Sequence, residues 1–118
     1  SYSSYTKIIN AKDIVQKLVL QWLEAIKTNS QDQQCSLVDY TLNTITGMED
    51  TDTPQYDIVA KVVYHAKPGN SGDCWWFTNR RGDRGIIEKD GWIQTYDVFA
   101  VYRENGYFRL IVLHGWGI

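Results

Sequence analysis

Apolar residues recur at helical spacing near the start of the chain, between Asn10 and Asn29. Successive apolar positions lie on one face of an α-helix: Ala11, Ile14, Val15, Leu18, Val19, Trp22, Ala25 and Ile26. The side chain of Asn10 can cap the first turn, and Asn29 can end the helix in a left-handed conformation. The pattern therefore predicts one amphipathic helix of about 18 residues.

The rest of the chain has the patterns of β-strands. Residues 36–46 are rich in β-branched side chains, and residues 56–66 place Tyr56, Ile58, Ala60, Val62 and Tyr64 on one face. Another strand opens with Trp75, Trp76 and Phe77, which point to both of its faces because they are consecutive.

Two turn signals follow, Asp90-Gly91 and Asn105-Gly106, and both are typical of hairpins. Residues 92–103 and 107–115 are then neighbouring antiparallel strands. A helix followed by four or five such strands indicates the α+β class. We predict a single domain over residues 1–118, with one N-terminal amphipathic helix packed on a curved antiparallel sheet.

The second hairpin predicts which residues face one another. If Asn105 and Gly106 form the loop, Phe99 lies opposite Val112 and Asp97 lies opposite His114. Both faces of the hairpin are rich in apolar residues, and one helix covers only one face. This favours a partner on the second face, or a sheet curled strongly enough to cover itself.

The predicted Asp97–His114 pair has a chemical interpretation. A carboxylate beside an imidazole orients the ring and raises its basicity, as a general base requires. Tyr96 or Tyr102 can then polarise a substrate oxygen. The alternative interpretation is an ordinary cross-strand charge pair, which contributes at most about 1 kcal/mol.

Aromatic and arginine side chains are the candidate binding residues. At least one of Trp75 and Trp76 lies away from the helix-covered face, either against a ligand or partner or beneath a neighbouring loop. The arginines of residues 80–84 can capture a phosphate or carboxylate, or form a solvated loop. The predicted binding residues are Trp75, Trp76, Tyr96, Tyr102, Arg80, Arg81, Arg84 and Trp116.

Composition narrows the classes of partner. A formal net charge of −2, with 22% charged residues, provides no basic field for nucleic acid or an anionic membrane. Cys35 and Cys74 match no metal or redox spacing, and they are either separate thiols or one disulfide. We predict no metal and no cofactor. A cytoplasmic location is slightly favoured over a secreted one, and localisation stays open.

The helix ending in Val19-Leu20-Gln21-Trp22-Leu23, with long antiparallel strands and a final Asn-Gly hairpin, resembles the NTF2-like and cystatin-like fold groups. The resemblance is architectural and covers most of the chain. It implies a helix lying in the palm of a curled sheet. Members of these groups range from isomerases and dehydratases to dimeric binding modules, so the fold does not select the function.

Two functions follow as expectations. The first is a non-enzymatic binding or interaction module, forming a homodimer or binding another protein through an aromatic-rich sheet face. The second is a small cone-pocket enzyme, similar to an isomerase, dehydratase or hydrolase, that acts on a small molecule through Asp97 and His114.

Overall fold

A helix and an open antiparallel sheet make up the part of the chain that the computed structural model describes, residues 10–31, 36–47, 56–69 and 86–114. The elements in chain order are α1 (Ala11–Asn29), β1 (Leu37–Gly47), β2 (Ile58–Pro68), β3 (Ile86–Ile87), the short 3₁₀ turn η2 (Lys89–Gly91), β4 (Ile93–Glu104) and β5 (Tyr107–His114). The predicted α+β class is confirmed.

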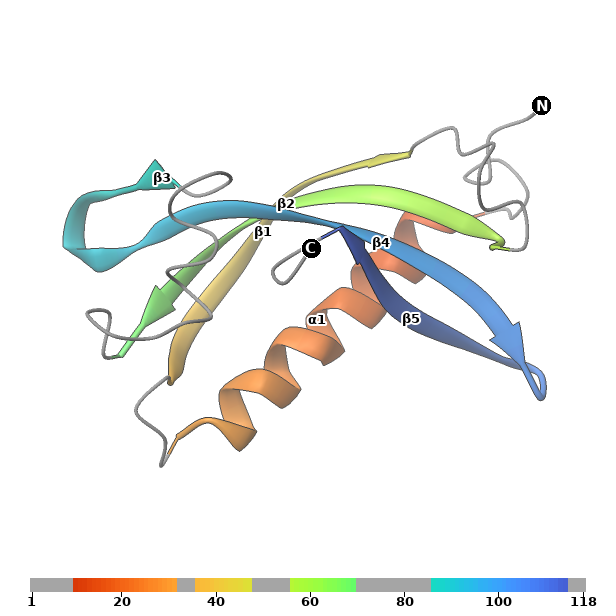
Figure 1. Cartoon of the computed structure of the whole chain (residues 1–118), viewed down its shortest axis with the longest axis horizontal. Helices are drawn as coiled ribbons and strands as arrows, with labels where there is room; N and C mark the ends of the chain where they lie inside the picture. The colour runs from red at the N-terminus through yellow and green to blue at the C-terminus, as the bar shows by residue number, and fades with distance from the viewer. Residues whose placement is uncertain (1–9, 32–35, 48–55, 70–85, 115–118) are drawn as a thin grey trace.

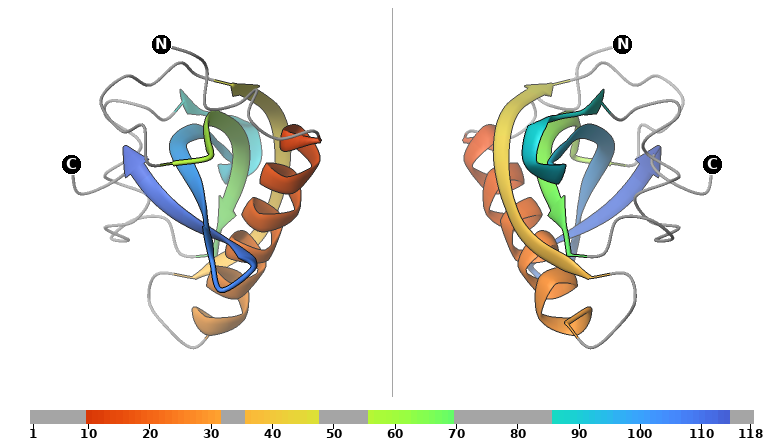
Figure 2. Two further views of the ribbon diagram at one scale, coloured as in Figure 1. Left: turned by 90° about the vertical axis from the view of Figure 1, so that its right-hand side faces the viewer. Right: turned by 90° about the vertical axis from the view of Figure 1, so that its left-hand side faces the viewer.

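The sheet has β4 at its centre. β2 pairs with one edge of β4, and β1 pairs with the far edge of β2. The other edge of β4 is shared, with β3 at one end and β5 at the other. The strands curve, and α1 crosses their concave side diagonally (Figure 1). End views show α1 on one side of the sheet only (Figure 2). We call this side the inner face and the opposite side the outer face.

The buried stripe of α1 is narrower than its sequence suggests. The helix residues with at most 4% exposure are spaced four apart: Ala11, Val15, Val19 and Leu23. Ala25, predicted on the apolar face, is exposed, and Leu23 is buried although the predicted face omits it. The helix crosses the sheet at one angle, so only residues along that line of contact are fully buried.

Both ends of α1 differ from the predicted caps. Asn10 has a left-handed backbone and makes no side-chain cap bond, although its carbonyl accepts the Ile14 N–H at 3.1 Å. At the other end, Asn29 is still helical and Ser30 follows it with φ −103°. The prediction that Asn29 ends the helix in a left-handed conformation is therefore wrong. The Ser30 hydroxyl accepts the Leu37 N–H at 3.0 Å. A tertiary bond to the first strand thus takes the place of a local stop signal.

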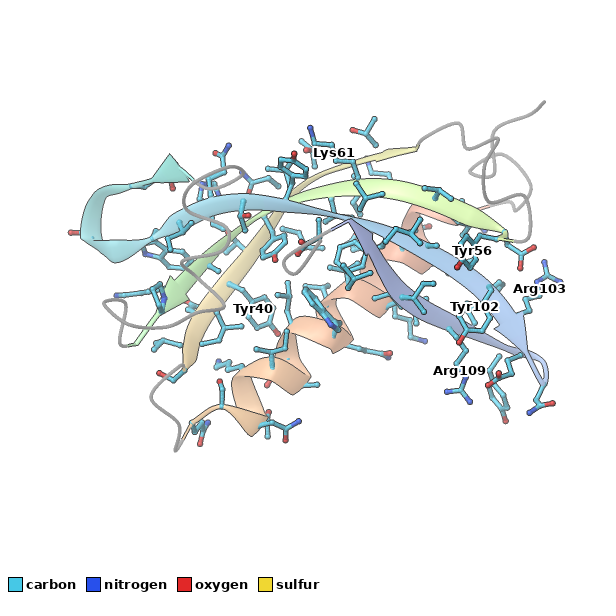
Figure 3. The ribbon with its side chains drawn as sticks, in the orientation of Figure 1. Tyr40, Tyr56, Lys61, Tyr102, Arg103 and Arg109 are labelled. Atoms are coloured by element: carbon cyan, nitrogen blue, oxygen red, sulfur yellow. The ribbon has the colours of Figure 1, made fainter. Side chains whose placement is uncertain are left out.

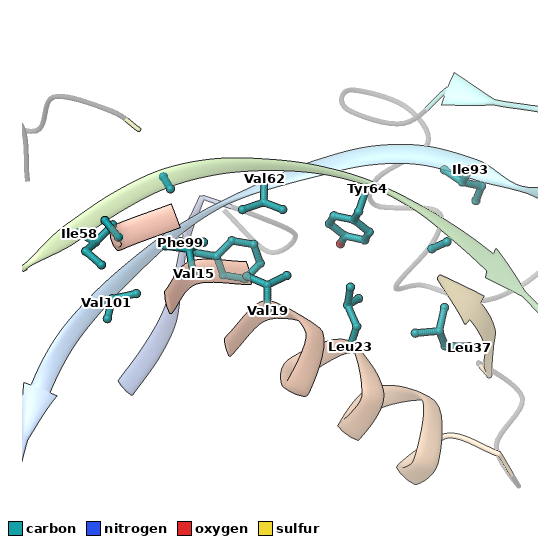
Figure 4. Packing of buried hydrophobic residues seen from close by; sticks show 13 residues of the cluster. Val15, Val19, Leu23, Leu37, Ile58, Val62, Tyr64, Ile93, Phe99 and Val101 are labelled. Carbon is teal, nitrogen blue, oxygen red and sulfur yellow. The ribbon is translucent and has the colours of Figure 1, made fainter. Parts of the chain in front are cut away.

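The inner face holds the main core. Side chains of α1 pack against Val62, Tyr64 and Phe99 (Figure 4). The ring of Trp22 meets Phe99 and Tyr64 edge-on, with centroids 5.2 and 6.4 Å away. Burying one large apolar side chain contributes about 1.5–3 kcal/mol. These contacts therefore hold α1 against the sheet.

A polar contact joins α1 to the outermost strand. The Tyr40 hydroxyl in β1 donates a hydrogen bond to Glu24 Oε1 at 2.5 Å. This bond, together with partial burial and the nearby carboxylate charges, raises the pKa of Tyr40 to about 12. The helix is thereby tied to the sheet at its solvent-exposed margin.

The turn between β4 and β5 is as predicted. Asn105 and Gly106 have φ of 53° and 82°, the positive values that a two-residue type I′ loop needs. Phe99 lies opposite Val112, as the predicted register requires. Asp90 and Gly91 also have positive φ, at the bend between β3 and β4.

Beyond Val112 the register changes. His114 lies opposite Val98, so the prediction that it lies opposite Asp97 is wrong. The ladder is irregular between Val98 and Phe99, where β5 contains one extra residue, Leu113, that has no partner position in β4. Such a bulge shifts every later partner by one position.

The outer face has its own apolar cluster, as the two-sided pattern of the hairpin predicts. Val59, Val98 and Ala100 are at most 6% exposed, and the half-buried Tyr56, Ile111 and Leu113 pack against them. This burial arises within a single chain. The centre of the outer face is therefore covered by the chain itself, which is one of the two outcomes that the sequence left open, and a partner elsewhere on this face stays a prediction.

Candidate functional site

A groove of about 680 Å³ lies beside the outer cluster, where β2 begins and β4 ends. Its lining, as far as the described residues go, consists of Tyr56, Asp57, Tyr102, Arg103 and Ile111. Tyr56, Tyr102 and Arg103 gather at the end of the sheet that carries the Asn105–Gly106 turn (Figure 3). We call this site the Tyr102 groove.

Two tyrosine rings form its apolar wall. The rings of Tyr56 and Tyr102 lie with centroids 6.4 Å apart and planes at 49°. The Asp57 N–H donates to the Val101 carbonyl at 2.8 Å, which holds the chain before β2 against β4 and brings Tyr56 beside Tyr102. The prediction that Tyr56 faces the same side as Ile58 is wrong, because Tyr56 precedes the regular strand and packs with the outer cluster.

A charged pair forms the other wall. Arg103 Nε lies 3.8 Å from Asp57 Oδ2, and the two side chains are 60% and 28% exposed. The Arg103 guanidinium carbon also lies 5.3 Å from the centre of the Phe108 ring. A long, exposed ion pair of this kind contributes little to stability. The guanidinium therefore keeps donors that face solvent and can bind a carboxylate of a partner.

Tyr96, a predicted binding residue, lies on the outer face but outside the Tyr102 groove. The Lys61 ammonium sits 4.4 Å from the centre of its ring, in cation–π geometry. Nearby, His65 lies 2.8 Å from Asn43 Oδ1 and 2.7 Å from Glu88 Oε1, so both ring nitrogens have partners. The Tyr96 ring and the His65 ring therefore both contact other side chains of the same chain.

Asp97 lies on the inner face, fully buried, where it accepts a hydrogen bond from the Tyr64 hydroxyl at 2.6 Å. Tyr96 and Tyr102 point to the outer face, since their positions in β4 have the opposite parity. The predicted set of Asp97 with one of these tyrosines is therefore not brought together. The backbone of His114 is one register step from the predicted place.

A second groove, of about 420 Å³, separates α1 from the β4–β5 hairpin. It is lined by Ile14, Lys17, Leu18, Gln21, Gly106, Tyr107 and Phe108. Tyr107 is 68% exposed, which is high for so large an apolar side chain. We call this site the helix–hairpin groove.

Several predicted site residues lie outside the described residues, and their roles stay predictions: Trp75, Trp76, Arg80, Arg81, Arg84 and Trp116. The same holds for the pairing of Cys35 and Cys74. Within the described ranges, no cluster of three or more His, Cys, Asp or Glu side chains is placed to bind a metal. None of the described helices is long and apolar enough to cross a membrane.

Most of the described lining of the Tyr102 groove was not predicted from the sequence. Of the described residues that line it, Tyr102 alone was among the predicted binding residues. The hairpin register could have placed Ile111 near it, because Ala100 lies opposite Ile111 on the same face. The Asp57–Arg103 pair depends on the alignment of β2 with β4, which no turn signal in the sequence specifies.

No match was found when the chain was compared with protein-family models, with curated proteins and with solved structures. The resemblance to NTF2-like and cystatin-like folds is thus supported only at the level of a helix packed on an antiparallel sheet. Function has to be inferred from the geometry of the two grooves.

Proposed function

We propose that this chain is a non-enzymatic interaction module that binds a segment of another protein in the Tyr102 groove. The observation that supports this function is the pairing of two tyrosine rings with an exposed arginine in one groove of about 680 Å³. Tyrosine and arginine are enriched among the residues that dominate binding energy at protein interfaces.

The lining indicates the chemistry of the bound segment. An apolar or aromatic side chain can pack between Tyr56, Tyr102 and Ile111, which are all half-buried and lose little freedom on binding. A neighbouring carboxylate can displace Asp57 from Arg103, since that pair is long and solvent-exposed. The preferred ligand is therefore a short segment with an aromatic residue next to an acidic one.

This function is favoured over acid–base catalysis. A catalytic set needs its carboxylate and its tyrosine on one face, within hydrogen-bond reach of the same atom. Asp97 instead is buried on the inner face, hydrogen-bonded to Tyr64, on the opposite face from the Tyr102 groove. Non-catalytic binding modules also occur among the folds that the chain resembles.

Selection from a phage-displayed random peptide library tests the proposal. We expect wild-type protein to enrich peptides with an aromatic–acidic pair, and Tyr102→Ala to bind those peptides at least about tenfold more weakly, equivalent to about 1.4 kcal/mol. Tyr107→Ala is the matched control, because it removes an exposed tyrosine outside the groove.

Two results would overturn the proposal. One is a selection in which wild type enriches no sequence above Tyr102→Ala. The other is a set of enriched peptides that lose as much affinity with Tyr107→Ala as with Tyr102→Ala, since the contact would then lie elsewhere.

A further inference from the structure

The β5 edge carries little of the usual protection against pairing within the part of the chain that the structure describes. Among the described strands, β5 has a neighbour on one side only, namely β4. It reads Tyr-Phe-Arg-Leu-Ile-Val-Leu-His from Tyr107, with Arg109 as its one Lys, Arg, Asp or Glu and with no proline. Exposed edges in natural sheets normally carry charges, prolines or bulges. The β5 edge is regular from Tyr107 to Val112, and over this length it carries a single charged residue.

The backbone groups on this edge can be identified. Val101 turns its carbonyl toward β2, because that oxygen accepts the Asp57 N–H at 2.8 Å. Val101 also lies opposite Leu110 of β5. The backbone N–H and C=O of a residue in an antiparallel strand point to the same side. Val101 therefore makes no hydrogen bond to Leu110, and the two form a non-hydrogen-bonded pair. The N–H and C=O of Leu110 then point away from β4. The alternation along the strand gives Phe108 and Val112 the same direction.

The helix leaves room beside this edge. The helix–hairpin groove lies between α1 and the start of β5, with Phe108 and Tyr107 on one wall and Ile14 and Leu18 on the other. Ile14 and Leu18 are only half-buried. An added strand would therefore extend the sheet without displacing α1, and its inner side chains would cover apolar surface of the helix.

We propose that β5 pairs with β5 of a second copy of this chain, antiparallel, about a two-fold axis through Leu110. In this register Phe108 meets Val112 of the partner subunit, and every outward amide on the regular part of the edge is bonded. On the outer face, Arg109 meets Ile111 of the partner subunit, so the two guanidinium groups are not opposite one another. The strand is thus complementary to itself, which favours a second copy over a foreign strand.

This interface goes beyond the proposed function, because the dimer does not need the Tyr102 groove. Hydrogen exchange of the wild-type protein at increasing concentration tests it directly, with mass measured by sedimentation. As the mass doubles, we expect the amides of Phe108, Leu110 and Val112 to gain about tenfold protection or more. The amides of Arg109 and Ile111 already bond to β4 and should change little.

A pair of variants separates the backbone contact from side-chain packing. Both Val112→Pro and Val112→Ala lose the valine side chain. Only Val112→Pro also loses the backbone N–H that points outward. We expect dimerisation to weaken at least about tenfold for Val112→Pro relative to Val112→Ala. Tyr102→Ala should dimerise like the wild type, so loss of peptide binding and loss of the dimer are distinguishable.

Either of two results overturns the dimer. One is a chain that stays monomeric at the highest concentration, with the Leu110 amide exchanging equally fast throughout. The other is a dimer in which the outward amides gain no protection, since its interface would lie elsewhere. If the proline variant fails to fold, the wild-type exchange pattern alone decides.

Discussion

The two faces of the sheet bury apolar residues in different ways. The inner face is covered by α1, and its buried side chains form one cluster that includes Val15 of the helix and Leu37 of β1. The outer face has a small cluster at Val59, Val98 and Ala100, with polar and aromatic contacts around it. The side chains on a face covered by a helix are buried and stabilise the fold. The outer face keeps a groove and exposed charge at its margin, and these are what a binding site requires.

The largest expected effect tests whether stability depends mainly on the inner face. Leu23→Ala removes a fully buried side chain of α1, and we expect the free energy of unfolding to fall by about 2–5 kcal/mol because a cavity forms under the helix. Urea denaturation followed by circular dichroism measures it. Leu113→Ala is the matched control on the outer face, where the side chain is half-buried, and about 1 kcal/mol is expected. Equal losses for both variants would contradict the comparison.

A smaller effect comes from the buried polar bond on the inner face. Tyr64→Phe removes the hydroxyl that donates to Asp97, and we expect the free energy of unfolding to fall by about 1–3 kcal/mol because a hydrogen bond to a buried carboxylate is lost. The control is Tyr96→Phe, which keeps the ring beneath Lys61 and should change stability by less than about 0.5 kcal/mol. A Tyr64→Phe protein as stable as Tyr96→Phe would show that this bond is unimportant.

The smallest effect belongs to the solvent-exposed bond between α1 and β1. The pKa of Tyr40 is raised to about 12 in the folded chain, from an ordinary value of 10.0. Folding therefore favours the neutral phenol. The contribution is complete below about pH 10 and is lost as the pH rises through about 12. Comparing Tyr40→Phe with wild type by denaturation at pH 9, 10 and 11, we expect a small difference that shrinks as the pH rises. A difference that stays constant would show that Glu24 does not hold the proton on Tyr40.

Local patterns predicted the elements well. The positions of α1, β4 and β5 follow from apolar spacing and from the Asn105-Gly106 turn, because both depend on neighbours within a few residues. The register held from the turn as far as Val112. It failed at His114, because no residue in β5 marks the bulge, so His114 does not lie opposite Asp97 in the ladder.

The candidate site was harder to predict than the fold. The Tyr102 groove combines the start of β2, the end of β4 and the middle of β5, and its charged pair exists only because β2 aligns with β4. Likewise, Asp97 is a buried partner of Tyr64 because Val62 and Tyr64 lie beside it across the sheet. Sequence spacing contains no information on such alignments between distant segments.

By itself, the sequence determined an α+β chain with one amphipathic helix, a type I′ hairpin and a sheet that is apolar on both sides. Periodicity and turn chemistry are local properties, so they can be read along the chain. The tertiary structure decided which apolar face α1 covers, which of the described strands lie at the edges of the sheet, and which tyrosine lies beside an arginine. Those outcomes depend on how strands far apart in sequence align, and that alignment is set by the packing of the whole sheet against α1.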